Sequence, residues 1–120
     1  MNILIVDDSQ LLQSRLNHAL RKVNVNMNIS QAITCREALE AFGPFTPDKI
    51  ILDISLPDGS GIGLLQEFKK KDPSIQVIMF TNYPTDEFKK RCIELGADYF
   101  LDKSNMKELI NIIYPAQAQN

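Results

Sequence analysis

The chain of 120 residues contains no tryptophan, only two cysteines and five glycines, and none of its apolar runs exceeds four residues. A membrane-spanning helix needs about 20 consecutive apolar residues, so the sequence offers no candidate span. The segment Met1-Asn2-Ile3 lacks the basic start of a secretory signal peptide. Cys35 and Cys92 match no metal-binding or redox spacing, which predicts two reduced, unreactive thiols.

The sequence also lacks a large excess of charge, since 13 lysines and arginines stand against 15 aspartates and glutamates. A domain that binds nucleic acid directly presents a strongly basic face to the phosphates, and a net charge of −2 does not favour one. Hydrophobic residues make up 44% of the chain, which is enough to bury a core. We therefore expect a soluble, cytoplasmic domain that binds neither membranes nor nucleic acid.

Short apolar runs alternate with longer amphipathic stretches along the chain. The runs Ile3–Val6 and Val77–Phe80 are apolar at every position, which indicates strands buried on both faces. Between such runs, apolar residues recur at helical spacing, as Leu12, Leu16 and Leu20 do. The sequence predicts strands over residues 3–6, 24–32, 49–52, 75–80 and 99–101, and helices over 10–22, 35–42, 62–71, 85–95 and 106–113.

Capping and breaking residues mark the ends of several predicted helices. Thr34 with Glu37 forms a capping box, and Gly43-Pro44 is expected to stop the helix that it begins. Gly96 is expected just past the end of the fourth helix. Ser104 or Asn105 is expected to cap the last one.

Five strand–helix units in succession predict an α/β fold in which a doubly wound parallel sheet carries helices on both faces. We expect the flavodoxin-like (βα)5 arrangement with strand order 2-1-3-4-5. A single domain is expected over residues 1–115, followed by a mobile tail or linker stub over residues 116–120.

Polar side chains follow four of the predicted strands at the point where each strand ends. They are Asp7 and Asp8 after the first strand, Asp53 after the third, Thr81 after the fourth and Lys103 after the fifth. The carboxyl ends of parallel strands meet at one edge of the sheet, where doubly wound proteins bind their ligands. The sequence therefore predicts that these side chains converge on one crevice.

Three carboxylates in one crevice repel one another, by about 4 kcal/mol for a pair roughly 4 Å apart at an effective dielectric constant near 20. Lys103 supplies one positive charge, and a divalent cation would supply the two that remain. Oxygen ligands favour Mg²⁺, with Mn²⁺ as the alternative. A metal site beside a carboxylate nucleophile, a hydroxyl and an ammonium is typical of phosphoryl transfer.

Four segments occur in a set order and spacing along the chain: Ile5-Val6-Asp7-Asp8; Ile51-Leu52-Asp53 with Leu56-Pro57-Asp58-Gly59-Ser60-Gly61; Thr81; and Gly96-Ala97-Asp98 leading to Lys103. With these segments the chain resembles the receiver domain of two-component response regulators, the CheY-like superfamily. The resemblance runs from the first strand to the last helix.

The resemblance implies a role for each residue of the crevice. Asp53 would be the phosphoacceptor, and Asp7 and Asp8 would hold Mg²⁺ together with Asp53 and the backbone carbonyl of Ser55. Lys103 would pair with the phosphoryl oxygens. Thr81 would hydrogen-bond to the phosphoryl group, and Phe100 occupies the position of the aromatic switch residue.

Three positions depart from the usual pattern of that family. Ser104 replaces the proline that often follows the lysine in a cis peptide, which leaves the isomer of the Lys103–Ser104 bond open. Phe100 replaces the commoner tyrosine and so lacks its hydroxyl. Asn82 and Tyr83 add bulk where small residues are common, so with Ser55 they are expected to control access of water to Asp53 and to slow loss of the phosphoryl group.

Each of these residues also has an ordinary structural interpretation. Asp7-Asp8 would serve as a helix N-cap pair, and Lys103 would form a surface ion pair with Asp102. Phe100 would be a fixed core ring. His18 falls on the polar side of its helix and is interpreted as a solvated residue, not as a phosphodonor.

The sequence most favours a signalling switch that takes a phosphoryl group from a histidine kinase or phosphotransfer protein. Such a switch would catalyse only its own phosphorylation and dephosphorylation. Its fourth helix, fifth strand and fifth helix would then change and bind a downstream protein, an attached output domain or, in a dimer that forms on phosphorylation, a second copy. The alternative is a pseudo-receiver that binds partners without being phosphorylated.

Overall fold

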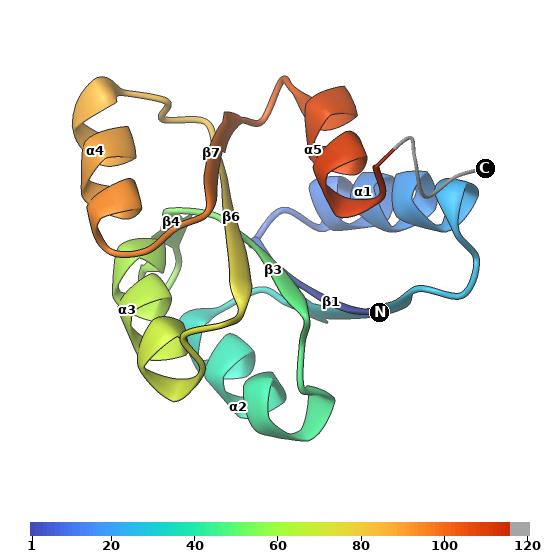
Figure 1. Ribbon diagram of the computed structural model, residues 1–120, viewed down its shortest axis with the longest axis horizontal. Coiled ribbons are helices and arrows are strands. Elements are labelled where there is room, and N and C mark those ends of the chain that lie inside the picture. Colours follow the sequence, from blue (N-terminus) through green and yellow to red (C-terminus); the bar gives the residue numbers. More distant parts are fainter. Residues whose placement is uncertain (116–120) are drawn as a thin grey trace.

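A computed structural model describes residues 1–115, which form a five-stranded parallel sheet with helices on both faces (Figure 1). The tail predicted over residues 116–120 lies outside the described residues. The strand order is β2-β1-β3-β6-β7, which is the predicted order 2-1-3-4-5 with β6 and β7 as its fourth and fifth strands. The strands are β1 (Asn2–Val6), β2 (Asn28–Ala32), β3 (Lys49–Leu52), β6 (Gln76–Thr81) and β7 (Tyr99–Asp102).

Helices α1 (Gln10–Val23) and α5 (Met106–Ile113) cover one face of the sheet (Figure 1). Helices α2 (Cys35–Phe45), α3 (Gly61–Lys71) and α4 (Asp86–Glu94) cover the other. Side chains of β1 alternate between the two cores, because Ile3 and Ile5 pack under α1 and α5 while Leu4 and Val6 pack on the opposite side. This two-sided burial is why the run is apolar at every position.

The second strand is shorter than the sequence predicts, since it begins at Asn28 rather than at Asn24. The Asn24 N–H donates to the Leu20 carbonyl and closes α1. The Asn24 side chain then accepts a hydrogen bond from the Asn26 N–H, and its carbonyl accepts one from Met27. An asparagine that bonds to the backbone two residues ahead favours a turn, and here this turn replaces the first part of the strand.

Helix α2 runs past the expected stop at Gly43-Pro44 and ends at Phe45. Pro44 lies in the last turn, so only one further residue has to continue the helix beyond it. Thr46 then ends the helix in the left-handed region, with φ of 45°, and its N–H donates to the Phe42 carbonyl. At the other end the predicted cap is confirmed, because the Thr34 hydroxyl accepts from the Glu37 N–H.

Two helix ends near β7 differ in how they are capped. Gly96, with φ of 103°, follows α4 as predicted, and the bonds from Gly96 to Ile93 and from Ala97 to Cys92 form a Schellman motif. Asn105 occupies the N-cap position of α5 but makes no side-chain cap bond, and its amide instead donates to Glu108. Every peptide bond among the described residues is trans, including the bond from Lys103 to Ser104.

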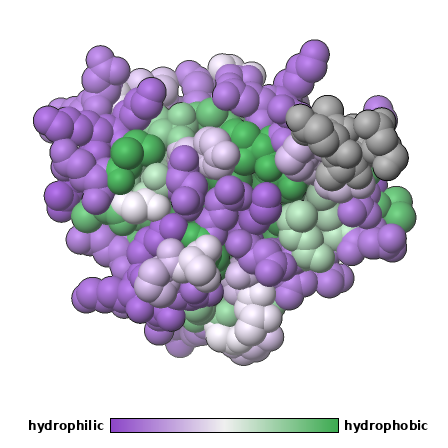
Figure 2. All heavy atoms as spheres, in the orientation of Figure 1, coloured by the Kyte–Doolittle hydropathy of each residue, from purple (hydrophilic) through white to green (hydrophobic). Residues whose placement is uncertain are grey.

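Within residues 1–115 no helix is long and apolar enough to cross a membrane. Hydrophilic side chains predominate on the face of the molecule in Figure 2, with smaller apolar areas between them. Cys92 is fully buried and Cys35 is half-buried. Burial, with the neighbouring Asp58 carboxylate, raises the pKa of the Cys35 thiol to about 11, which keeps it protonated near neutral pH.

The segment between β3 and α3 forms a small antiparallel hairpin, β4 (Ser55–Leu56) and β5 (Gly59–Ser60), where the sequence predicted only a turn. Asp58, at its tip, accepts hydrogen bonds from the backbone N–H groups of Cys35 (2.7 Å) and Arg36 (3.1 Å). These are unpaired donors of the first turn of α2, where a carboxylate is favourable. Asp58 therefore fastens the loop that follows Asp53 to a helix on the same side of the sheet.

Gly61, the first residue of α3, lies against the backbone of Asp53. A Cβ atom at this position would lie 1.8 Å from the Asp53 carbonyl oxygen. The Gly61 N–H donates to the Ile54 carbonyl over 2.6 Å, which holds the start of the helix close to the end of β3. Only glycine permits this approach.

We predict that Gly61→Ala lowers the free energy of unfolding by about 1–3 kcal/mol, because the added methyl group forces the two backbones apart. Gly63→Ala is the matched control, since a Cβ at Gly63 meets nothing within 4 Å. That variant should gain about 0.5–1 kcal/mol from the better helix propensity of alanine. Urea unfolding measures both, and equal effects of the two substitutions would contradict the close approach.

A second prediction concerns Asp58. The hydrogen bond from the Cys35 N–H, helped by the one from Arg36, lowers the pKa of the Asp58 carboxyl below its ordinary value. The stability that Asp58 contributes is therefore fully present above the unfolded pKa of about 3.9 and is lost as the pH falls through the lower folded pKa. Asp58→Asn should be less stable than wild type at pH 7, and the difference should shrink below about pH 4. A difference that stays constant with pH would argue against this cap.

Candidate functional site

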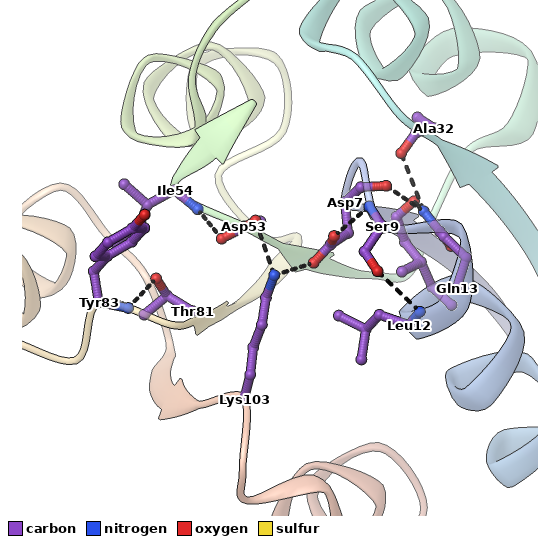
Figure 3. A network of polar contacts seen from close by, with 11 residues as sticks. Asp7, Ser9, Leu12, Gln13, Ala32, Asp53, Ile54, Thr81, Tyr83 and Lys103 are labelled. Atoms are coloured by element: carbon purple, nitrogen blue, oxygen red, sulfur yellow. Dashed lines mark hydrogen bonds and ion pairs between the residues drawn. The ribbon is translucent and has the colours of Figure 1, made fainter. Parts of the chain in front are cut away.

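Figure 3 shows four of the predicted polar residues, Asp7, Asp53, Thr81 and Lys103, at the carboxyl end of the sheet, and Asp8 belongs to the same acidic cluster. Backbone hydrogen bonds set their positions, because the Asp53 N–H donates to the Val6 carbonyl (3.0 Å) and the Lys103 N–H donates to the Thr81 carbonyl (2.9 Å). The first bond joins the ends of β1 and β3, and the second joins those of β6 and β7. The parallel ladder therefore brings residues 50 positions apart into one crevice.

The Lys103 ammonium lies between two carboxylates. Its Nζ atom is 2.7 Å from Asp7 Oδ2 and 3.0 Å from Asp53 Oδ2. The exposed fractions of these side chains are 13% for Lys103, 3% for Asp7 and 6% for Asp53, so solvent screens the pairs weakly. The surface pair with Asp102 does not form, because the Asp102 carboxylate accepts from the Ser104 N–H instead.

Burial has opposite consequences for the two partners. It raises the pKa of the Asp53 carboxyl above its ordinary value, and the hydrogen bond and charge of Lys103 offset only part of the rise. Burial lowers the pKa of the Lys103 ammonium, but its hydrogen bonds to Asp7 and Asp53 outweigh burial and leave that pKa above its ordinary value. Lys103 therefore stays charged near neutral pH, and ionised Asp53 is held in an environment that disfavours its charge.

Each carboxylate of the ion-paired triad also accepts a backbone hydrogen bond. Asp7 Oδ1 accepts from the Ser9 N–H and Asp53 Oδ1 accepts from the Ile54 N–H, both over 2.8 Å. The N-cap of α1 is Ser9, whose hydroxyl accepts from the Leu12 N–H. The interpretation of Asp7-Asp8 as a helix cap is therefore wrong.

Asp7, Asp8 and Asp53 form an acidic cluster in which one carboxylate oxygen from each lies within 4.8 Å of the others. Asp7 and Asp53 are buried and Asp8 is exposed, so the cluster opens to solvent on one side. Three carboxylates against one ammonium leave two negative charges, and an all-oxygen donor set fits Mg²⁺. Ser55, the predicted carbonyl ligand, lies at the exposed start of β4, two residues after Asp53.

Thr81 is fully buried at the end of β6, and its hydroxyl accepts a hydrogen bond from the Tyr83 N–H over 2.9 Å (Figure 3). Asn82 and Tyr83 are both exposed, Tyr83 by 53%. The Tyr83 ring lies beside Ile54, and with Ser55 and Phe88 these residues line a pocket of about 470 Å³. Of the three residues predicted to control access to Asp53, Ser55 and Tyr83 therefore share a pocket beside Ile54, the residue that follows Asp53, and Asn82 is not among its lining residues.

Phe100 is half-buried on β7, opposite Met79 of β6, and packs against the core beneath α2, α3 and α4. It is neither fully enclosed nor free in solvent. His18 is exposed on α1, as predicted.

Two residues that position the site were not identified from the sequence. In the sequence, Asp58 is typical of a turn. Its hydrogen-bond partners on α2 lie 22 and 23 positions away, so no local pattern indicates them. Gln13 is buried on α1 and bonds to the ends of β1 and β2. A polar residue in the apolar stripe of the helix was the one available signal for Gln13.

Comparison with known proteins places the chain in a family. Residues 3–114 match the family model described as "Response regulator receiver domain". The chain is 30% identical to the chemotaxis protein CheY of Halobacterium salinarum, over 88% of this chain and 86% of that protein. It is also 34% identical to the sensory transduction protein LytR of Staphylococcus haemolyticus, but spans only 46% of that protein's length. It spans 29% of a cyclic di-GMP phosphodiesterase of Thermotoga maritima that is 31% identical.

Solved structures share the fold. The CheY-like receiver domain protein of Methanospirillum hungatei is 29% identical with a TM-score of 0.86, and the alignment covers 93% of this chain and 89% of that one. The beryllofluoride-activated DrrB receiver domain is 26% identical with a TM-score of 0.83, covering 93% and 92%. From the family match, the shared topology and these relatives, we conclude that the chain belongs to the receiver-domain family of response regulators.

Proposed function

We propose that this receiver domain takes a phosphoryl group on Asp53 from a histidine kinase or a phosphotransfer protein and acts as a cytoplasmic signalling switch. The observation that carries the proposal is the Lys103 ammonium, held between the buried carboxylates of Asp7 and Asp53 beside a third carboxylate, Asp8. This arrangement supports the proposal, because phosphoryl transfer to a carboxylate needs positive charge beside it, which Lys103 and a bound cation would supply.

In the proposed reaction an Asp53 carboxylate oxygen forms a bond to phosphorus while the bond from phosphorus to the donor breaks. The leaving group is the imidazole of a phosphohistidine, or acetate when acetyl phosphate is the donor. Lys103 would bind the phosphoryl oxygens, and the Thr81 hydroxyl would donate to one of them. Asp7, Asp8 and Asp53, with the Ser55 carbonyl, would hold Mg²⁺, which neutralises charge on the transferring group. The chain would catalyse only this transfer and the later hydrolysis.

The output of the switch would begin at Thr81. Its hydroxyl now accepts from the Tyr83 N–H, so a movement toward a phosphoryl group would disturb the segment that leads into α4. The space left by Thr81 would lie beside β7, and the half-buried Phe100 ring would turn toward it. A rearranged surface of α4, β7 and α5 would then bind a downstream protein, an output domain or, in a dimer, a second copy of the chain.

We predict that Asp53 is the phosphoacceptor. Wild type incubated with acetyl phosphate and Mg²⁺ should give one retarded band on a phosphate-binding gel, because aspartyl phosphate is retained. Asp53→Asn should give none, and wild type with EDTA should lose most of the band. Asp86→Asn, which changes an exposed aspartate on α4, is the matched control and should be labelled like wild type.

An unlabelled wild type that still folds would favour the pseudo-receiver alternative. Undiminished labelling of Asp53→Asn would assign the acceptor to another residue. The same samples with beryllofluoride, which a related receiver domain binds in its activated form, test the switch by NMR. Chemical-shift changes should reach residues 84–114, and changes confined to the crevice would contradict the proposed output.

A further prediction concerns the lifetime of the phosphoryl group. The Tyr83 side chain lines a pocket with Ile54 and Ser55, the two residues that follow Asp53, and we propose that it covers the path of a water molecule that attacks the phosphoryl group. Because a misplacement of about 1 Å can change a rate on the order of a hundredfold, removing this cover should speed hydrolysis. Tyr83→Ala should therefore lose the phosphoryl group at least several-fold faster than wild type, with Tyr99→Ala as the control on β7. An equal or longer half-life in Tyr83→Ala would refute the shielding role.

A further inference from the structure

Gln13 interrupts the apolar face of α1. The helix buries Gln13, Leu16 and Leu20 against the sheet, and Gln13 is only 3% exposed. Helical periodicity predicts an apolar side chain at a position that faces the core. Where a sequence breaks such a local rule without an evident gain in packing, a functional reason is the first to consider.

The Gln13 amide nitrogen faces three backbone carbonyls (Figure 3). Its Nε2 atom lies 3.0 Å from the oxygen of Ile5, 3.1 Å from that of Asp7 and 3.1 Å from that of Ala32. An amide nitrogen has two hydrogens, so it is shared among more acceptors than it can serve fully. The Gln13 Oε1 atom, by contrast, is buried and has no hydrogen-bond partner among the described residues.

These contacts lie at the point where β1 and β2 end. The Asp7 N–H donates to the Ala32 carbonyl over 3.0 Å, which is the last bond between the two strands. Gln13 extends this connection between the strand ends to α1, because its amide donates to the carbonyls of both Asp7 and Ala32. The backbone of Asp7 is therefore fixed from both its N–H and its carbonyl.

A fixed backbone orients the Asp7 carboxylate. Asp7 Oδ1 accepts from the Ser9 N–H and Oδ2 from Lys103, so rotation of the residue would break both contacts. The same carboxylate contributes an oxygen to the acidic cluster with Asp8 and Asp53. Gln13 thus acts on the cluster through the backbone carbonyl of Asp7 rather than through a carboxylate.

We propose that Gln13 is a positioning residue for the divalent-cation site, which it serves by holding Asp7 in the orientation that the site requires. The inference rests on the proposed function, because it presumes that the acidic cluster binds Mg²⁺. Two effects on stability oppose each other at this residue. An apolar side chain of similar size would remove the unpaired buried oxygen, but it would leave the carbonyls of Ile5, Asp7 and Ala32 without this donor.

The test is a Mg²⁺ titration of Gln13→Met, followed by the amide chemical shifts of residues 7–9, with urea unfolding measured without metal. Methionine matches the length of glutamine but donates no hydrogen bond. We expect about tenfold weaker Mg²⁺ binding, the lower end of the usual effect of losing a partner of a metal ligand. The variant should still unfold cooperatively, with a urea midpoint within about 1 M of wild type, because it removes an unpaired oxygen while three carbonyls lose one donor. Gln10→Met, at the exposed start of α1, is the matched control and should bind Mg²⁺ like wild type.

Asp7→Asn tests whether Gln13 acts through Asp7. In that background, Gln13→Met should weaken Mg²⁺ binding little further, because residues that act through one another are not additive. Unchanged affinity in Gln13→Met would overturn the inference, and so would a variant that loses its fold, since the amide would then serve stability. If wild type itself binds no Mg²⁺, the proposed function fails first, whereas wild-type binding with an unaffected variant refutes only the role of Gln13.

Discussion

The architecture of the crevice depends on the compensation of buried negative charge by Lys103. Asp7 and Asp53 are almost fully enclosed, and two such carboxylates at the end of neighbouring strands would repel strongly without a cation between them. The ammonium from the end of β7 supplies that cation and so links the ends of β1, β3 and β7. A third carboxylate, Asp8, leaves the crevice with a residual negative charge that favours a divalent ion.

The rest of the fold holds these charges in place through the backbone rather than through side-chain packing alone. The parallel ladder aligns the ends of β1, β3, β6 and β7, and the close approach of Gly61 to the Asp53 carbonyl fixes the start of α3 beside Asp53. Asp58 attaches the loop between β3 and α3 to the first turn of α2 through two backbone hydrogen bonds. A backbone frame of this kind suits a site that works by holding charged groups in fixed positions.

Thr81 connects the crevice to the segment that leads into α4. Its side chain is fully buried, and its hydroxyl accepts a hydrogen bond from the N–H of Tyr83, in a segment whose side chains are exposed. Phe100 is packed on one side and partly open on the other. A group added to Asp53 would therefore have to change few contacts in order to rearrange α4 and β7. A small two-state switch requires such a short connection.

The sequence by itself predicted the order and the polarity pattern of this protein. Runs such as Ile3–Val6 are buried on both faces and identify the strands, and the residues that end them, Asp7, Asp53, Thr81 and Lys103, follow from chain order alone. The strand order and the convergence of these residues were therefore predictable. Pro44 misled the prediction for the end of α2, which runs one residue further and is closed by the Thr46 N–H bond to Phe42. The start of the second strand was misjudged for another reason: the alternation of Val25, Met27 and Ile29 suggested a strand, whereas Asn24 closes α1 and forms a turn.

Only the tertiary structure decided which partners these residues take. No spacing in the sequence shows that Lys103 bonds to Asp7 and Asp53 rather than to Asp102, since that choice depends on the register of β7 against β6. The tasks of Gln13 and Asp58 are hidden for the same reason, because their acceptors and donors are backbone groups of distant segments. Backbone groups are alike at every position, so the sequence cannot mark them, and folding alone brings them within reach.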